Sequence, residues 1–466
     1  MSLLWPMGQR MRLNIEKMAK HVFVEYSMLF VLFGLCIFFA IATLETQIPT
    51  GQPAADQLAP IIREAIQKDG KIVLIAGLST DDKDFIDAID KQPGIPENRM
   101  TRIIGESPRR VRQKLEGMVA RGDIPAGIIC TRSISHWSLL QNRDKIFNGL
   151  GNIPLLLPRE RTTSNFLKPA NLKNVAGQSA VFAIIAIGMT LVIITGGIDL
   201  SVGSLVALSA VTCAMTIRDL CGGVGADWGG ILIGVAAAVL VCAIVGFLSG
   251  IMVTGFGMPP FIVTLATMSI ARGLAQILAE GQSVYQVPVD FSWLAVGKPI
   301  GIPNEVIVMI VLYIGAHVLM TKTTLGRWFY AVGSNREAAR LSGVPVALVL
   351  MIAYVASGAL AGVGGVLEAS RLQSGSPLYG GMYELYVITA VVVGGTSLSG
   401  GDGKILGTLY GALAIAVIRN GMNLMNIESY TQGVVMGVLI LVAVFIDSLK
   451  RGHVVLWLRR LFIRPT

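Results

Sequence analysis

The sequence predicts an α-helical polytopic membrane protein of about ten transmembrane helices, with an inserted α/β extracytoplasmic domain. The 466 residues are 53% hydrophobic and only 14% charged, whereas roughly 25% of a soluble globular chain is charged. The mean hydropathy is +0.65, and the apolar residues gather in runs close to the ~20 residues that a membrane-spanning helix needs. One long polar segment, Glu45 to Asn165, interrupts these runs near the N-terminus.

Ten apolar runs are candidates for spanning helices. They lie near Phe23 to Leu44, Ala176 to Gly196, Leu200 to Ile217, Gly229 to Val253, Pro260 to Glu280, Pro303 to Thr321, Ala347 to Glu368, Glu384 to Val393, Lys404 to Met422 and Tyr430 to Asp447. The count is soft, because the Glu384 run is short and because the break from Gly196 to Gly203 either separates two spans or interrupts one. The chain then divides into a cytoplasmic N-terminus 1–22, a first transmembrane helix 23–44, an extracytoplasmic insert 45–165, a transmembrane core 166–447 and a cytoplasmic tail 448–466.

Basic residues in short loops mark the cytoplasmic side of a membrane. The sequence has three basic clusters. The first, before the first run, is Arg10, Arg12, Lys17 and Lys20, and the second, between the sixth and seventh runs, is Lys322, Arg327, Arg336 and Arg340. The third, after the last run, is Lys450, Arg451, Arg459, Arg460 and Arg464. With ten spans all three fall on one side, so both termini are expected in the cytoplasm and the insert outside. The first run also resembles a signal peptide with Ala40-Ile41-Ala42 as its cleavage site. Its removal would still leave the second cluster inside.

Several other classes of function are disfavoured. The net charge of +9 does not indicate nucleic-acid binding, because the basic residues cluster beside apolar runs. Gly400 to Lys404 superficially resembles a phosphate loop, but Ile405 stands where Ser or Thr must hold magnesium. Five cysteines without paired spacing indicate neither a disulfide framework nor a zinc site. We therefore expect no catalytic residue, no metal and no directly bound cofactor, and any ATPase that drives this protein must be another chain.

Within the insert, short apolar segments alternate with helical patterns. The segments Lys71 to Gly77, Arg102 to Gly105 and Ala126 to Thr131 predict strands, whereas Asp81 to Asp90 and Ser107 to Arg121 predict helices. This alternation favours a small parallel sheet. Ligand binding at the turn Gly77 to Thr80 is one interpretation. A protein-contact or spacing domain is preferred, because Asp81 and Asp82 already occupy the positive end of the following helix.

Two glycine-containing breaks follow apolar runs. The first contains Gly196, Gly197, Asp199 and Ser201, in which Asp199 or Ser201 can accept hydrogen bonds from the first amides of the next helix. A weaker copy contains Gly394, Gly395 and Ser399, with Gly394 aligned to Gly196. Transporters often carry broken helices at corresponding positions of internal repeats, near the translocation path. A pair of ordinary membrane helix caps is an equally weighted interpretation.

Arg272 and Arg419 lie well inside their apolar runs. A cation at such a depth costs several kcal/mol unless it meets a partner or water, so each arginine is a candidate for the translocation path. Counting along the spans puts both in the outer half of the membrane, where Glu280, Glu368 or Glu384 is a possible partner. A structural ion pair or a snorkelling side chain is the alternative.

The cytoplasmic segment Thr324 to Pro345 is unusually structured for a loop. Ser334 or Asn335 can cap a short helix, Glu337 lies at its favourable N-terminus, and Gly343 can end it. A two-turn helix between spans presents a rigid knob. We favour a docking element for a cytoplasmic partner over an interfacial helix.

Several ordered segments resemble the permease subunits of ribose-type ABC importers, in the superfamily that includes branched-chain amino-acid permeases. The resemblance covers about Asn165 to Asp447, through Gly188–Ser204, Pro260–Met268, Gly333–Gly343, Tyr383–Leu385 and Gly394–Gly403. It implies an inner-membrane permease, usually a homodimer, that joins a cytoplasmic ATPase, which uses the ATP, and an extracytoplasmic sugar-binding protein. The family's coupling helix would map onto a segment that includes Gly333, Asn335, Arg336, Glu337, Ala338, Ala339 and Gly343. The insert departs from the family, whose first external loop is ordinarily short.

The resemblance also bears on the solute. A monosaccharide such as ribose is expected, because Gly196 to Ser201 resembles the sugar branch of the family. Branched-chain amino acids, nucleosides and furanose-like signals stay open. An ion-coupled secondary transporter and a membrane sensor are the other classes. The structured cytoplasmic helix argues against the former, and ten spans with two breaks are excessive for the latter.

Overall fold

The computed structural model describes residues 27–67, 70–142, 146–147 and 153–450, and these divide into two compact units. One unit is Leu44–Ser164 and the other comprises the described residues on either side of it. The N-terminal basic cluster, the start of the first apolar run and nearly all of the C-terminal cluster lie outside the described residues. Each unit is described below by itself.

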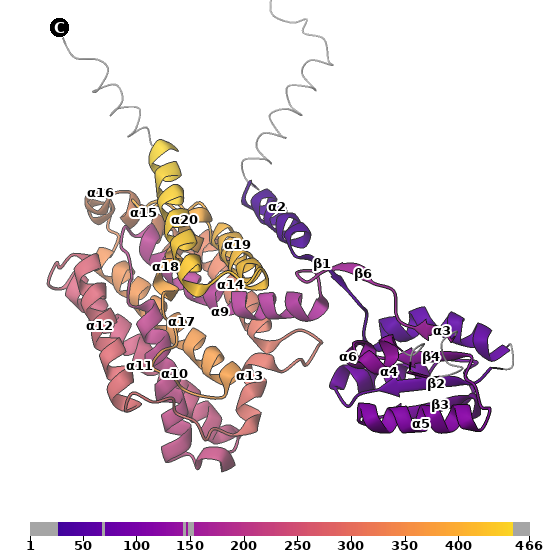
Figure 1. Cartoon of the computed structure of the whole chain (residues 1–466). Coiled ribbons are helices and arrows are strands. Elements are labelled where there is room, and N and C mark those ends of the chain that lie inside the picture. The colour runs from indigo at the N-terminus through magenta and orange to yellow at the C-terminus, as the bar shows by residue number, and fades with distance from the viewer. Residues whose placement is uncertain (1–26, 68–69, 143–145, 148–152, 451–466) are drawn as a thin grey trace, which may run out of the picture. The chain divides into compact units, whose positions relative to one another are not determined.

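The larger unit is helical (Figure 1). Its α-helices are α2 (Ser27–Ala42), α9 (Pro169–Ile194), α10 (Val202–Met215), α11 (Trp228–Thr254), α12 (Pro260–Leu278), α13 (Trp293–Val296), α14 (Asn304–Lys322), α15 (Thr324–Ser334), α16 (Arg336–Leu341), α17 (Val346–Leu372), α18 (Tyr383–Val393), α19 (Ile405–Leu424) and α20 (Ser429–Lys450). Each apolar run of the sequence overlaps one of these helices, although several helices extend beyond the run, as α9 does by beginning at Pro169 instead of near Ala176. The break after Gly196 separates two helices, α9 and α10, and does not interrupt a single one.

Seven helices of the described chain are long and apolar enough to cross a membrane: α9, α10 with the π-helix Thr216–Leu220 that continues it, α11, α12, α14, α17 and α19. The apolar parts of α2, α18 and α20 are shorter. A polytopic helical membrane protein is therefore the fold class. The number of ten spans stays a prediction, because length and composition select only seven.

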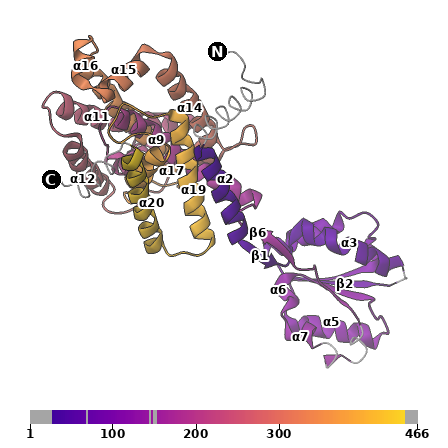
Figure 2. The ribbon, with the colours of Figure 1, turned by 90° about the horizontal axis from the view of Figure 1, so that it is seen from above.

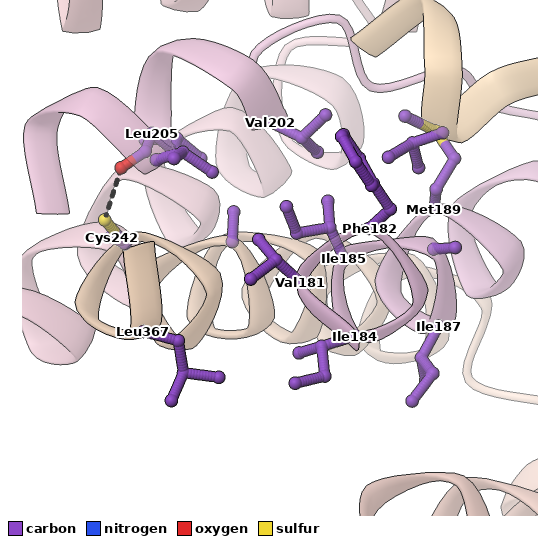
Figure 3. Close-up of a cluster of buried hydrophobic side chains, with 14 of the residues drawn as sticks. Val181, Phe182, Ile184, Ile185, Ile187, Met189, Val202, Leu205, Cys242 and Leu367 are labelled. Atoms are coloured by element: carbon purple, nitrogen blue, oxygen red, sulfur yellow. Dashed lines mark hydrogen bonds between the residues drawn. The ribbon is translucent and has the colours of Figure 1, made fainter. Parts of the chain in front are cut away.

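The core of this unit lies around α9. In the most apolar stretch of each helix, 94% of the residues of α9 are buried, against 28% for α11 and 22% for α12. Helix α9 is therefore central, and α11 and α12 are peripheral. A helix that is hydrophobic on all sides, as α9 is, belongs inside a bundle. Figure 3 shows Val181 and Ile185 of α9 among side chains of neighbouring helices. In the same cluster the Cys242 thiol of α11 donates to the Leu205 carbonyl of α10 at 3.4 Å.

Glycines allow α11 and α17 to pack closely. A Cβ on Gly246 would overlap the carbonyl of Tyr354, and one on Gly358 would overlap the carbonyl of Cys242. Each of these glycines has another glycine four residues further along its helix, Gly250 and Gly362, and such spacing permits close helix approach. Figure 2 shows α2 beside α19, where the ring of Phe39 lies over Gly421.

The unit Leu44–Ser164 contains a four-stranded parallel sheet in the order β3-β2-β4-β5. The strands are β2 (Ile72–Ala76), β3 (Met100–Ile104), β4 (Gly127–Cys130) and β5 (Leu155–Leu156). Helices α3 (Gly51–Gln67) and α4 (Thr80–Asp90) cover one face, and α5 (Pro108–Ala120), α6 (Arg132–Ser135) and α7 (Ser138–Gln141) cover the other. Alternate side chains of β2 supply the two cores, because successive residues of a strand point to opposite faces.

A separate antiparallel ribbon connects this unit to the rest of the chain. It pairs β1 (Leu44–Gln47) with β6 (Arg161–Ser164), with Leu44 opposite Ser164. In the helical unit, the amide of Asn165 donates to the carbonyl of Thr43 at 3.0 Å. The chain therefore leaves the helical unit and returns to it at one place.

Candidate functional site

Three segments that are far apart in the sequence meet at one junction of the helical unit. They are the break after α9, the turn between α15 and α16, and the loop between α18 and α19. The amide of Gly401 donates to the carbonyl of Ile194 at 2.8 Å, which joins the two breaks directly. The hydroxyl of Tyr330 in α15 donates to the carbonyl of Gly403 at 2.8 Å. We call this meeting point the glycine junction.

Glycine is required where these backbones touch. A Cβ on Gly333, at the end of α15, would lie 2.5 Å from the amide nitrogen of Gly401 and would overlap the carbonyl of Ile194. A Cβ on Gly400 would lie 3.0 Å from both the amide nitrogen of Gly196 and the carbonyl of Gly333. The close approach therefore depends on missing side chains in both breaks and in the turn before α16.

The short helix α16 is bound to the glycine junction by its first residue. The Arg336 guanidinium donates to the carbonyl of Thr195, the C-terminal cap of α9, at 3.2 Å. A cation at that place is favourable, because the C-terminal carbonyls of a helix carry partial negative charge. Figure 1 shows α15 and α16 adjacent to each other at one edge of the helical unit. A displacement of α16 would therefore be transmitted to the end of α9.

The local structure of α16 agrees with the capping expected from the sequence. The Asn335 side chain accepts from the amide of Ala338 at 3.0 Å, so Asn335 and not Ser334 is the cap. Gly343 has φ +80° just after the helix, a conformation that favours glycine. Ala339 is buried against the bundle, whereas Glu337 and Arg340 pair at 2.9 Å with 73% and 68% of their side chains exposed. So exposed a pair contributes little to stability, and its charges are accessible to a partner.

The first break is fixed by a buried carboxylate. Asp199 is 2% exposed, and its Oδ1 accepts from the amide and hydroxyl of Ser201 at 2.9 and 2.6 Å. Its Oδ2 accepts from the hydroxyl of Ser357 in α17 at 2.7 Å. The expectation that Asp199 bonds an amide at the start of α10 is therefore confirmed. The side chain of Ser201 makes no capping bond, so that alternative is wrong.

The two breaks share a helix-ending motif, but with an alignment shifted by one residue. The amide of Gly197 donates to Val192 and that of Thr396 donates to Val391, each closing the same turn at the end of its helix. The left-handed residue is Gly196 in the first break, with φ +77°, and Gly395 in the second, with φ +92°. In the structure Gly196 therefore corresponds to Gly395. The expected pairing of Gly196 with Gly394 is wrong because it matched residue letters instead of hydrogen bonds.

Ser399 also lies at the glycine junction, because its carbonyl oxygen would be 3.9 Å from a Cβ on Gly196. Gly394 packs elsewhere, since a Cβ there would lie 2.5 Å from the carbonyl of Gly407 in α19. Of the predicted break residues, Gly196 and Ser399 therefore approach each other across the glycine junction, whereas Gly394 packs α18 against α19.

The two arginines predicted inside the spans lie apart from the glycine junction. Arg272 donates from one guanidinium nitrogen to the carbonyls of Pro377 and Tyr379 at 2.7 and 2.8 Å. Arg419 lies over the rings of Phe182 and Tyr386, with centroids at 5.1 and 4.6 Å. Within the described ranges neither arginine forms an ion pair. The carboxylate partners expected from the sequence are thus replaced by carbonyls and aromatic rings.

Sequence reasoning missed one buried ion pair. Arg371, in the last turn of α17, pairs with Glu305, in the first turn of α14, and also donates to the carbonyl of Gly177 at 2.7 Å. The side chain of Glu305 is only 5% exposed and that of Arg371 is 19% exposed. The two residues lie at the ends of their apolar runs, but nothing in the sequence placed the start of α14 beside the end of α17.

Comparisons with known proteins identify the helical unit. Residues 171–444 match the family model described as branched-chain amino acid transport system / permease component. The chain belongs to this family of transport permeases. It is 42% identical over 291 residues to the ribose import permease protein RbsC of Escherichia coli strain K12. The aligned residues cover 62% of this chain and 88% of that protein. No solved structure matches.

Two further relatives are a second ribose permease and a permease named for another sugar. The ribose import permease protein RbsC of Bacillus subtilis strain 168 is 41% identical over 288 residues, 61% of this chain and 87% of that protein. The D-allose transport system permease protein AlsC of Escherichia coli strain K12 is 37% identical over 285 residues, 61% of this chain and 85% of that protein. The family match begins after the sheet-containing unit, so the permease resemblance does not extend to Leu44–Ser164.

Proposed function

We propose that this chain is the membrane-spanning permease subunit of an ATP-binding-cassette importer. It translocates a monosaccharide, such as ribose or a related sugar, across the inner membrane by alternating access, and a separate ATPase subunit drives the cycle. The names of its relatives support a sugar as the solute. The chain itself is a transport subunit and not an enzyme, and ATP is used by its partner.

The observation that carries this proposal is the bonding of α16 to the glycine junction. Arg336 holds α16 to the end of α9, while Gly333 and Gly401 bring the turn before α16 against both breaks. A cytoplasmic ATPase that closes on ATP pushes on the exposed charges of α16. Because Gly333, Gly401 and Ile194 meet through backbone atoms, the push moves α9 and the loop before α19 together. This couples ATPase closure to rearrangement of the bundle.

The proposal includes an orientation and a set of partners. Ten spans place α16 and both breaks in the cytoplasm with the two termini, and the insert outside the cell membrane. The partners are the ATPase, an extracytoplasmic sugar-binding protein, a second permease chain and the lipid bilayer, without nucleic acid. Arg272 and Arg419 belong to the outer half of the bundle in this orientation.

Affinity purification from native membranes tests the coupling assignment. Wild type is compared with Glu337→Arg, which reverses an exposed charge of α16. Asp219→Arg is the matched control, because Asp219 also pairs with a neighbouring arginine, at 2.6 Å, but lies between α10 and α11. We expect a stoichiometric ATP-binding subunit with wild type and the control, and its loss from Glu337→Arg. If no ATPase is recovered with wild type under gentle extraction, ion-coupled transport replaces the proposal.

A further inference from the structure

The sheet-containing unit has open pockets beside α4, and one of them lies at the carboxyl ends of β2 and β4. One of about 300 Å³ is lined by Thr50, Ser79, Asp81, Asp82, Ser133 and His136. A second, of about 410 Å³, shares Thr50 and Asp81 with the first and extends along α4. Thr50, which lines both pockets, comes soon after β1, so both pockets begin near the ribbon that connects this unit to the rest of the chain.

The strand order gives an independent reason to expect a ligand at this place. β2 pairs with β3 on one side and with β4 on the other. The chain leaving β2 enters α4 on one face of the sheet, and the chain leaving β4 enters α6 on the opposite face. Such a reversal opens a crevice between the carboxyl ends of the two strands, which is where open α/β sheets bind ligands. Ser79 follows β2, and Ser133 and His136 follow β4, so the first pocket is this crevice.

The lining of the pocket limits the chemistry of the ligand. The carboxylate of Asp82 is buried and accepts from the hydroxyls of Ser79 at 2.7 Å and Ser133 at 2.9 Å. The side chains of Asp81 and His136 are exposed and make no hydrogen bond to any described residue. Two carboxylates repel an anion. Over the described residues, no group of three acidic, histidine or cysteine side chains is arranged to hold a metal ion.

A neutral solute with several hydroxyl groups satisfies these conditions. Its hydroxyls donate to the carboxylate of Asp81, to the remaining lone pairs of Asp82 and to the oxygen of Ser133, whose own proton is donated to Asp82, and they accept from the hydroxyl of Thr50. The imidazole of His136 can donate or accept, according to its tautomer. Small-molecule sites combine a concave surface with a few convergent polar groups, and this pocket has both.

We propose that the unit Leu44–Ser164 binds a small polyhydroxylated solute in the crevice between β2 and β4, through Asp81, Asp82, Ser133 and His136. The choice of a monosaccharide as that solute rests on the proposed function of the helical unit. The insert is then a solute-binding element covalently attached to the permease, and not a spacer.

Saturation-transfer difference NMR on the full-length protein in lipid nanodiscs tests this proposal. The probes are D-ribose, D-allose and L-arabinose, added without ATPase or binding protein. The test variant is Asp81→Asn/His136→Ala, whose two side chains stabilise no other part of the unit through hydrogen bonds. Glu116→Gln is the control, because it also neutralises one exposed carboxylate but lies on α5, which covers the other face of the sheet from α4.

We expect at least one sugar to give saturation transfer with wild type and with the control. The concentration for half-saturation should rise at least tenfold in the double variant. Equal half-saturation in wild type and the double variant overturns the proposal, as does the absence of sugar binding to wild type. Binding of Ca²⁺ but of no sugar also overturns it.

Sugar uptake into proteoliposomes with the co-purified ATPase separates the two proposals. If ribose is imported but binds the double variant as it binds wild type, the site in the insert is wrong and the permease function stands. If ribose binds through Asp81 and His136 but is not imported, the permease function is wrong and the site stands.

Discussion

Replacing Gly333 by alanine tests whether the glycine junction transmits movement from α16 to the bundle. The new Cβ would lie 2.5 Å from the amide nitrogen of Gly401, whereas close carbon contacts to polar backbone atoms are roughly 3.3 Å. The backbones must therefore separate by ~0.8 Å at Gly401, and by more at Ile194, because no side chain there can rotate away. Overpacking of this kind costs about 1–3 kcal/mol. Loss of the hydrogen bond from Gly401 to Ile194 adds about 1 kcal/mol.

These costs predict a large effect on coupling. Since about 1.4 kcal/mol is a factor of ten in an equilibrium, ATP-driven sugar uptake by Gly333→Ala in proteoliposomes should fall at least tenfold, while ATP hydrolysis by the bound ATPase continues. Gly315→Ala is the matched control, because Gly315 is in α14 with no atom within 4 Å of a new Cβ. Comparable amounts of both variants in the membrane would exclude a failure of assembly. Wild-type uptake by Gly333→Ala would refute the role of the junction.

Three further outcomes follow from the described contacts. Arg371→Met should lower the midpoint of thermal unfolding in detergent more than the double variant Arg371→Met/Glu305→Gln does, because an unpaired buried carboxylate costs about 3–5 kcal/mol; equal midpoints would contradict this. Arg272→Gln should lower sugar uptake more than dimer and ATPase assembly, and equal losses would reject a role in the path. Burial raises the pKa of Asp82, but hydrogen bonds from Ser79, Thr131 and Ser133 outweigh it and lower the pKa below its ordinary value of 3.8. The stability that Asp82 provides is therefore present above about pH 3.8 and lost below it, so the difference in thermal stability of the insert between wild type and Asp82→Asn should be smaller at pH 3 than at pH 7.

Features that depend on neighbouring residues could be predicted from the sequence. The runs of apolar residues located every long helix of the helical unit, because burial in a bilayer or a core requires a continuous apolar segment, whereas the 17-residue helix α3 of the insert, which has no such run, was missed. The capping of α16 by Asn335 and the ending at Gly343 were also predictable, since caps involve residues only a few positions apart. The bonding of Asp199 at the start of α10 belongs to the same group.

Features that depend on distant segments could not be predicted in the same way. The pairing of Glu305 with Arg371 requires α14 to lie beside the end of α17, and a single sequence does not indicate that. Arg419 was expected to meet a carboxylate, but its guanidinium lies over the rings of Phe182 and Tyr386. The contact of Gly333 with both breaks likewise arises only when three remote segments meet.

The paired strands β1 and β6 have a consequence for the evolution of this chain. Thr43 and Asn165 are joined by a hydrogen bond, so an ancestral permease could have connected them with a short turn. Insertion of a segment whose own ends are paired, as Leu44 and Ser164 are, leaves the surrounding fold unbroken, which is why such sites tolerate whole domains. The same property makes the insert exchangeable. Units with other binding preferences could be grafted between Thr43 and Asn165 without redesign of the membrane helices.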